Sequence, residues 1–285
     1  MSALARAFTL LGLVAVAACT EETALTSNIE VADSVATPAI QDVLIRTHDF
    51  SFEMPDTLYS GVTQLRLVNA GADMHHVYMV RLDGNHTAAD LLQALSAGPP
   101  PAWAVDVGGP NAPGAPGTET NATLELEAGK YAVLCVIPDP AGVPHIMHGM
   151  SKEVIVLPAT AATAELPEPT VVMTLDDYSF ETNVPLTAGR HVIQVENAAT
   201  QAHEVLLVRL EAGRTAPEVV KFLETRQGTP PGAIVGGITG IAPGQINQIT
   251  VELPAGEYAL VCFIPDARDG APHFAHGMMD QITVN

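Results

Sequence analysis

The sequence predicts an all-β fold made of two tandem β-sandwiches, each with one short inserted helix. Three observations support this prediction. The chain of 285 residues repeats itself at an offset of about 128 residues, its apolar residues mostly alternate with polar ones, and 23 glycines and 22 prolines interrupt the pattern at short intervals. Alternation with a period of two is typical of half-buried strands, and frequent glycine and proline disfavour long helices.

The first eighteen residues predict an export signal. One cation, Arg6, precedes a twelve-residue apolar run from Ala7 to Ala18, which is too short to cross a bilayer. The small residues stop at Cys19. This ending resembles a bacterial lipobox, in which the peptide is cut before a cysteine that carries lipid. We therefore expect an extracytoplasmic protein, in the periplasm or at the cell surface, anchored to a bacterial membrane by lipid on Cys19. A soluble-export signal with a chance cysteine is the alternative.

The residues after the signal divide into a tether and two repeated domains. Residues 19–42 have no apolar periodicity and are expected to be a flexible tether. The repeats predict a first domain over 43–157 and a second over 171–285, each of a usual size for a single domain. Between them, residues 158–170 are rich in alanine and proline and are expected to be a linker.

Within each copy the apolar pattern predicts short strands and one helix. In the first copy the strands are expected around residues 62–67, 77–82, 124–127, 131–137 and 154–157. In the second copy they are expected around residues 192–195, 205–210, 249–253, 258–264 and 281–284. Thr87 with Asp90, and Thr215 with Glu218, have the spacing of capping boxes, which predicts a helix after each threonine.

The charge of the chain excludes one class of partner. The formal net charge is −20, so no basic surface exists to neutralise the phosphates of a nucleic acid. The first domain has five basic against twelve acidic residues and the second has six against thirteen, a net charge near −7 for each. A protein partner is therefore expected to be basic, with docking that weakens as salt is added.

Side chains with metal-binding chemistry recur at equivalent positions in both copies. They are His75, Cys135, His145 and Met150 in the first copy, and His203, Cys262, His273 and Met278 in the second. Thiol, imidazole and thioether groups are ligands that copper prefers. A trigonal set of two histidines and one cysteine with a distant methionine is typical of blue-copper electron-transfer sites.

Three motifs in this order resemble the cupredoxin family, its plastocyanin-like members most closely. Gly-x-Tyr-x3-Cys ends at Cys135 and at Cys262, His-x4-Met begins at His145 and at His273, and an upstream Asn-x5-His occurs twice. The resemblance covers both copies nearly end to end. It implies Greek-key sandwiches, one copper ion per domain, and the eight residues above as ligands.

One spacing departs from the family pattern. Plastocyanin-like members have two residues between the cysteine and the second histidine, whereas this chain has nine (136–144) and ten (263–272). Closure entropy grows slowly with loop length, so the longer loop can still return its histidine to the thiol. In the alternative without metal binding, Cys135 and Cys262 are small buried hydrophobic residues of the core.

Further polar residues stand near the motifs in both copies. They are interpreted as groups that hydrogen-bond to the metal ligands, or as substitute ligands: His76, His148, His276, Asn69 and Asn197. His76 has Glu204 as its counterpart in the second copy, which favours a polar neighbour over a ligand.

The residues favour a membrane-anchored copper protein that carries single electrons, without being an enzyme. In the family, the second histidine exposes an edge to the redox partner, which here would be His145 or His273. The alternatives are a lipoprotein that sequesters or delivers copper without redox cycling, and a metal-free interaction lipoprotein on the same fold. Two-domain copper enzymes need His-x-His pairs or a histidine beside the cysteine, and neither occurs in the sequence.

Overall fold

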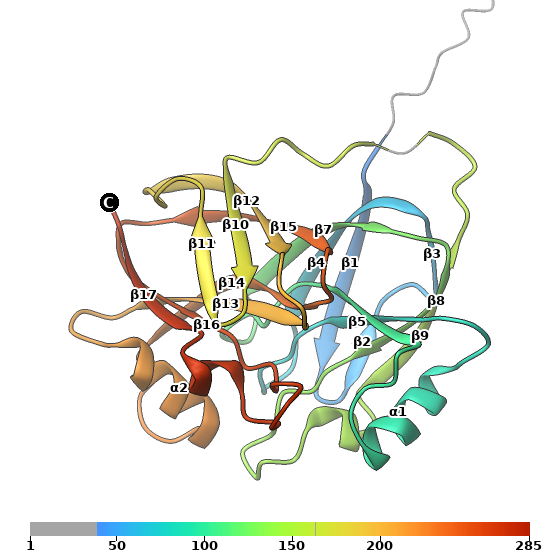
Figure 1. The fold of residues 1–285 in the computed structure, drawn as a ribbon, viewed down its shortest axis with the longest axis horizontal. Helices are drawn as coiled ribbons and strands as arrows, with labels where there is room; N and C mark the ends of the chain where they lie inside the picture. Colours follow the sequence, from blue (N-terminus) through green and yellow to red (C-terminus); the bar gives the residue numbers. More distant parts are fainter. Residues whose placement is uncertain (1–38, 163) are drawn as a thin grey trace, which may run out of the picture. The chain divides into compact units, whose positions relative to one another are not determined.

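The computed structural model describes residues 39–162 and 164–285, and most of these residues lie in β-strands (Figure 1). The predicted export signal, Cys19 and most of the predicted tether lie outside the described residues. In the described part, no helix has the length and apolar character needed to span a membrane.

Along the chain, the first copy has strands before and after one α-helix. Its elements are β1 (Gln41–His48), β2 (Ser51–Glu53), β3 (Thr57–Tyr59), β4 (Gly61–Asn69), β5 (Tyr78–Leu82), α1 (Ala88–Ala97), β6 (Ala104–Gly108), β7 (Glu119–Leu126), β8 (Gly129–Leu134), the 3-10 helix η1 (His145–His148) and β9 (Ser151–Leu157). Strand β1 includes the last two residues of the predicted tether, Gln41 and Asp42.

The second copy repeats most of this order. Its elements are β10 (Val171–Asp176), β11 (Ser179–Thr182), β12 (Gly189–Asn197), β13 (His203–Leu210), α2 (Ala216–Thr225), β14 (Gly232–Ile241), β15 (Ile246–Leu253), β16 (Gly256–Val261), the 3-10 helix η2 (His273–His276) and β17 (Met279–Val284).

The strands of the described residues form two sheets, and each sheet runs through both copies. The eight-stranded sheet has the order β11-β10-β12-β15-β7-β4-β1-β2, and the nine-stranded sheet has the order β17-β16-β13-β14-β6-β5-β8-β9-β3. The copies join where β15 pairs with β7, at Asn247 opposite Leu124, and where β14 pairs with β6, at Ile241 opposite Val107. Each copy is thus a β-sandwich, and the predicted fold class is confirmed. The boundaries 43–157, 158–170 and 171–285 stay predictions.

Each sandwich has its own apolar core between the two sheets. In the first copy, Ile45 of β1, Leu67 of β4 and Val133 of β8 are fully buried in one cluster. In the second copy, Met173 of β10 and Leu260 of β16 belong to the equivalent cluster. Buried and more exposed side chains alternate along β1, β10 and β12, so every second side chain of these strands points into the core.

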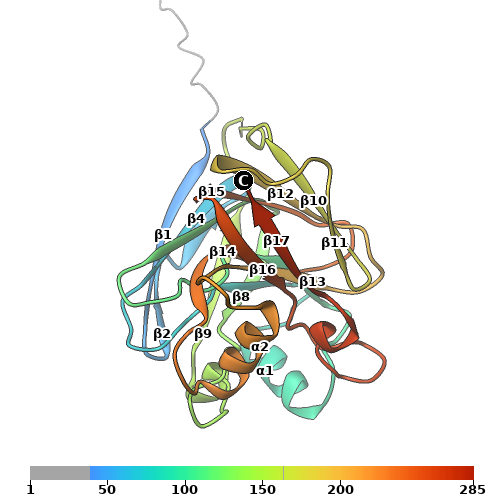
Figure 2. The same cartoon turned by 90° about the vertical axis from the view of Figure 1, so that its left-hand side faces the viewer.

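Both helices pack on the outer face of the nine-stranded sheet and lie on the lower side in Figures 1 and 2. Each begins at a predicted capping box, in which Thr87 pairs with Asp90 and Thr215 with Glu218. Leu91 of α1 and Val219 of α2 bury their side chains against the strands beneath. The two predicted helices are confirmed.

Small residues in β14 permit the close contact between the copies. A Cβ atom on Gly240 would overlap the hydroxyl of Tyr78 from the first copy. One on Gly237 would overlap the carbonyl oxygen of Val205 in its own copy and would lie 3.1 Å from Cβ of Asn111 in the first copy. Glycine is therefore required where β14 lies against the other copy.

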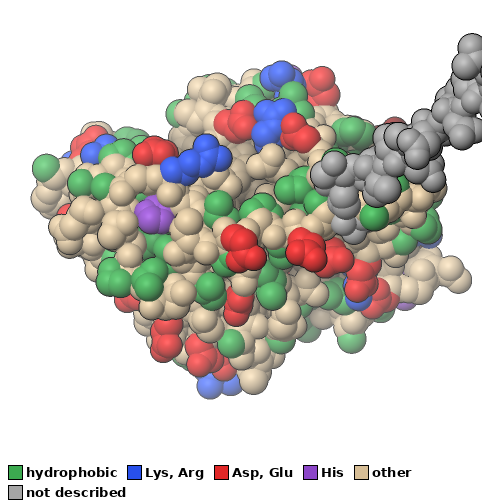
Figure 3. All heavy atoms as spheres, turned by 90° about the horizontal axis from the view of Figure 1, so that it is seen from above, with side chains coloured by type: hydrophobic (Ala, Val, Ile, Leu, Met, Phe, Trp, Pro, Cys, Tyr) green, Lys and Arg blue, Asp and Glu red, His purple; other side chains and the backbone are tan. Residues whose placement is uncertain are grey.

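Acidic side chains are scattered over the face seen in Figure 3, and basic ones gather in a few places among the described residues. Several basic groups are paired: Arg66 lies 2.9 Å from Asp42, and Arg214 lies 2.9 Å from Glu218. The acidic excess of the sequence is therefore left to face solvent.

Candidate metal centres

The recurring histidines and cysteines come from three segments at one end of each sandwich. In the first copy, His75 lies in the connection from β4 to β5, Cys135 directly follows β8, and His145 begins η1. In the second copy, His203 begins β13, Cys262 directly follows β16, and His273 begins η2. All six residues are fully buried.

The long segment between cysteine and second histidine folds back on itself in each copy. Pro138 bridges Pro144 and Pro265 bridges Pro272, as short antiparallel contacts. In the first copy the segment closes when His145 N donates to the carbonyl oxygen of Ile137 at 2.9 Å. The hairpin therefore delivers the histidine beside the cysteine despite its length, as the sequence reasoning allowed.

A left-handed glycine ends each 3-10 helix and directs the chain back to the core. Gly149 has φ +92° and Gly277 has φ +108°, a region that favours glycine. The next residue closes the turn, because Met150 N donates to the carbonyl oxygen of His145 at 3.1 Å, and Met278 N to that of His273 at 3.0 Å.

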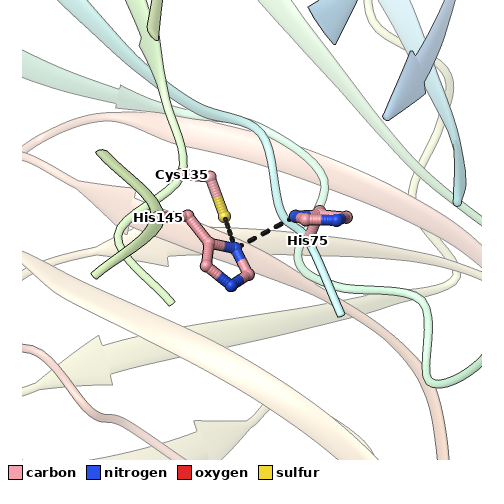
Figure 4. Close-up of side chains that lie close together, drawn as sticks. All are labelled: His75, Cys135 and His145. Atoms are coloured by element: carbon pink, nitrogen blue, oxygen red, sulfur yellow. Dashed lines mark hydrogen bonds between the residues drawn. The ribbon is translucent and has the colours of Figure 1, made fainter. Parts of the chain in front are cut away.

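The first group brings one sulfur and two ring nitrogens together (Figure 4). Nδ1 of His145 lies 3.4 Å from Sγ of Cys135 and 3.0 Å from Nδ1 of His75. The three ligand atoms all lie within 4.8 Å of one another. We refer to His75, Cys135 and His145 as site 1.

The second group repeats this arrangement and is called site 2. Nδ1 of His273 lies 3.4 Å from Sγ of Cys262, and the ring of His203 lies 4.4 Å from that of His273 between centroids. The three ligand atoms again lie within 4.8 Å of one another. Nδ1 of His203 is buried and has no hydrogen-bond partner among the described residues, so its lone pair is available.

A carboxylate orients the first histidine of each site. Nε2 of His75 lies 3.0 Å from Oδ1 of Asp49, and Nε2 of His203 lies 3.1 Å from Oδ1 of Asp177. A proton on Nε2 is needed for donation to the carboxylate, which leaves the lone pair on Nδ1 facing the cysteine. The same bond lowers the pKa of both aspartates.

Burial keeps the second histidines and the thiols uncharged. Loss of solvation lowers the pKa of His145, and lowers that of His273 to about 4. The same cause raises the pKa of Cys135 to about 12 and raises that of Cys262 further. A metal ion that binds the sulfur must therefore displace the thiol proton.

The residue after each first histidine supports the backbone beyond the cysteine. Nε2 of His76 accepts from Val136 N at 3.0 Å, and Oε1 of Glu204 accepts from Phe263 N at 3.0 Å. Both side chains are buried. His76 and Glu204 thus perform the same task in the two copies, and His76 does not join the ligand group.

The two asparagines upstream of the sites hold the loop that carries the first histidine. Asn69 donates from Nδ2 to the carbonyl oxygen of Asp73 at 2.7 Å and accepts from Gly71 N at 2.9 Å. Asn197 donates to the carbonyl oxygen of Gln201 at 2.8 Å in the same way. Their role is structural support of the loop.

The two methionines lie next to the cysteines through their backbone. Cys135 N donates to the carbonyl oxygen of Met150, and Cys262 N to that of Met278, both at 3.2 Å. Both side chains are fully buried. The backbone of each methionine of the His-x4-Met motif therefore lies beside the cysteine of its site.

The remaining histidines of the motifs lie outside the two sites. Nε2 of His148 lies 2.9 Å from Asp139, and Nε2 of His276 lies 3.2 Å from Asp269. Asp266, Asp269 and His276 form a further group with metal-ligand spacing, and Asp266 is already bonded by Tyr178 and Arg268.

Aromatic side chains cover the second histidines, which corrects one expectation. Phe50 packs edge-on against His145 at 5.0 Å, and Tyr178 against His273 at 5.5 Å between ring centroids. Both histidines are 0% exposed, and their Nε2 atoms are buried without a hydrogen-bond partner among the described residues. The expected exposed histidine edge is therefore absent in both copies.

The donor atoms of each site fit one metal ion. Bonds of about 2.0 Å to nitrogen and about 2.3 Å to sulfur place the ligand atoms of one ion roughly 3–4 Å apart, and the separations of 3.0 and 3.4 Å in site 1 are in this range. One thiol with two imidazoles favours copper over metals that prefer oxygen. Both copies have the cupredoxin-like sandwich fold that the sequence resemblance implies, and each site could hold one copper ion.

Comparisons with known proteins gave structural matches only. No protein-family model and no curated protein matches the chain. Auracyanin from Roseiflexus castenholzii is 21% identical, with a TM-score of 0.28 over 43% of this chain and 100% of its own. Auracyanin A, a "blue" copper protein from Chloroflexus aurantiacus, is 23% identical, with a TM-score of 0.30 over 41% of this chain and 99% of its own. The blue copper oxidase from Nitrosomonas europaea is 15% identical, with a TM-score of 0.24 over 86% of both chains.

Sequence reasoning missed the residues that orient and cover the sites. Asp49 and Asp177 recur at the repeat offset of 128, each followed by an aromatic residue with positive φ, Phe50 at +67° and Tyr178 at +69°. This shared Asp-aromatic pair is the signal that a fuller comparison of the two copies would have found.

Proposed function

We propose that this chain is an exported, lipid-anchored copper protein that carries single electrons through sites 1 and 2. The observation that supports this best is the convergence of one thiol sulfur and two imidazole nitrogens in a buried group, found twice in one chain. The proposed ligands are His75, Cys135, His145 and Met150, and His203, Cys262, His273 and Met278.

The surroundings of the sites suit electron transfer better than metal storage. A carrier needs ligands that stay in place when the oxidation state changes, and a bound ion supplies the one-electron couple. Asp49 and Asp177 hold the first histidines, and the proline bridges and 3-10 helices hold the second. Full burial of the ligands also keeps water away from the ion.

The proposed carrier docks through the exposed apolar side chains around site 1. Val136 and Val143 on the segment between Cys135 and His145 are 40% and 38% exposed, and Met147 of η1 is 67% exposed. Because the second histidine is buried, electrons reach the site through these covering side chains. The acidic domains favour a basic partner, whose docking weakens as salt is added.

Export and anchoring depend on the start of the chain. The apolar run that ends at Cys19 supports cleavage before this cysteine and its lipidation. Metabolic labelling with a radioactive fatty acid tests this part: wild type should be labelled and Cys19→Ser should not. A labelled Cys19→Ser variant would refute the lipid anchor without affecting the copper sites.

Copper reconstitution tests the electron-carrier function. We expect two copper ions per chain, intense red absorption from thiolate-bound Cu(II), and reversible bleaching by one electron per copper. Cys135→Ser and Cys262→Ser should each remove one of the two absorbing sites, and the double variant should be pale. A pale wild-type adduct that both substitutions leave unchanged would refute the proposal and favour copper binding without redox cycling.

A further inference from the structure

A cavity of ≈ 400 Å³ lies between the two copies, and none of the proposed metal ligands lines it. Its wall is mainly apolar, with side chains from both copies: Met74, Ile137, Leu206, Leu223, Phe263 and Ile264. A volume of this size is within the usual range of small-molecule sites, which are mostly apolar with a few placed polar groups.

The cavity touches the backbone that follows each cysteine. Ile137 follows Cys135 by two residues, and Ile264 follows Cys262 by two residues. Within the wall, His76 and Glu204 already accept hydrogen bonds from the chain, as described above. Nε2 of His76 and Oε1 of Glu204 are thus already engaged. The wall also contains one cation.

That cation is Arg226, which directly follows α2 of the second copy. Its backbone has φ +54°, in the left-handed region, and its side chain reaches the first copy, where Nη2 donates to the carbonyl oxygen of Pro138 at 3.5 Å. Its Nε atom is buried and has no hydrogen-bond partner in the described part of the chain. Asp73 is near enough to act on its charge, and no described carboxylate forms an ion pair with it within 4.0 Å.

An unpaired guanidinium beside an apolar wall is costly, and an anion that binds there offsets the cost. Burial lowers the pKa of Arg226, which reflects this loss of solvation. Removing water from a cation without a paired anion is unfavourable. A carboxylate is the anion whose geometry matches a guanidinium with two parallel hydrogen bonds.

We propose that this cavity binds a small apolar monocarboxylate, with its carboxylate on Arg226 and its hydrocarbon body against the apolar wall between the two copies. The wall also includes the acidic side chain of Glu224, which restricts the ligand to one negative charge at the Arg226 end. The repeat equivalent of Arg226 is Gly98, so the first copy offers no second cation of this kind.

Isothermal titration of the full-length protein with 2-naphthoate tests the proposal. The neutral amide of the same ring system, 2-naphthamide, shows what the charge contributes. We expect saturable binding of one naphthoate per chain, at least tenfold tighter than naphthamide. Arg226→Gln should weaken naphthoate binding at least tenfold and leave naphthamide binding unchanged. The matched control is Arg190→Gln, an exposed arginine on β12, which should bind naphthoate as wild type does.

A second variant tests the position of the site. Leu223→Trp places a larger side chain into the cavity from α2 and should weaken both ligands, with an unfolding transition that remains cooperative. Naphthoate binding that survives both Arg226→Gln and Leu223→Trp would overturn the proposal, as would equal affinity for naphthoate and naphthamide. No metal is needed for the measurement, so its result is independent of the proposed electron transfer.

Discussion

Oδ1 of Asp177 lies 3.1 Å from Nε2 of His203, and this contact determines which nitrogen of the histidine faces Cys262. The first copy has the same contact at 3.0 Å, between Asp49 and His75. Asp49 also accepts from the backbone of Ala72 and Asp73, whereas Asp177 accepts from the hydroxyl of Thr200. Asp177 is therefore the better position at which to test orientation separately from loop folding.

Asp177→Ala should weaken copper binding at site 2 by about 10- to 100-fold, the usual effect of losing the partner of a metal-binding histidine. Asp177→Asn should recover part of the loss, because its amide oxygen still accepts from Nε2. Competition titration against a copper chelator measures both affinities in one chain, with site 1 as the internal control. Equal affinities in wild type and Asp177→Ala would show that the contact does not orient the ligand.

Copper binding at site 2 should release about one proton near pH 7. Burial raises the pKa of Cys262, so the sulfur carries a proton, and burial lowers the pKa of His203 and His273, so both rings are neutral and release no net proton when metal binds. The test is calorimetry of Cys135→Ser protein in buffers of different ionisation enthalpy. Binding without proton release would mean that the thiol is not a ligand.

Glu204 should make the metal-free protein less stable as the pH rises from about 4.5 to about 7. Burial raises its folded pKa from 4.5 to about 7, so in this window the folded state keeps a proton that the unfolded state has lost. The loss amounts to about 3 kcal/mol in the free energy of unfolding and levels off above pH 7.

Glu204→Gln should remove this pH dependence, because its amide oxygen still accepts from Phe263 N and cannot ionise. Urea denaturation at several pH values measures the difference between the two proteins. Glu224→Gln, at an exposed position on the neighbouring helix, is the matched control. Parallel pH curves for wild type and Glu204→Gln would contradict the burial of a proton at this position.

Asn69→Ala should lower the free energy of unfolding by about 3 kcal/mol, because one buried and one partly buried backbone group lose their partners. Those groups are the carbonyl oxygen of Asp73 and the N–H of Gly71. Asn85→Ala, at an exposed turn position, should change it by less than about 0.5 kcal/mol. Similar values for both variants would show that Asn69 does not hold the loop.

Local signals in the sequence predict much of this fold. The capping boxes at Thr87 and Thr215 begin helices, and the continuous apolar runs from Tyr131 and Tyr258 form buried strands that end beside the cysteines. These predictions succeed because the apolar pattern of a strand and the start of a helix are both determined within a few residues.

Contacts between distant segments could not be predicted in the same way. Strand β14 contains Gly236, Gly237 and Gly240, a composition that disfavours strands, and the contact with Tyr78 of the other copy explains Gly240. A repeat shows that two copies exist and does not show which strands join them. The burial of His145 and His273 likewise depends on Phe50 and Tyr178, which come from a distant turn.

X-ray absorption spectroscopy of the copper-loaded protein tests the central claim most directly, because it counts the atoms bonded to the metal. We predict one sulfur at short distance and two imidazole nitrogens for each copper ion, with the short sulfur lost in the Cys135→Ser, Cys262→Ser double variant. A wild-type spectrum with nitrogen and oxygen neighbours and no short sulfur would contradict the claim that Cys135 and Cys262 hold copper.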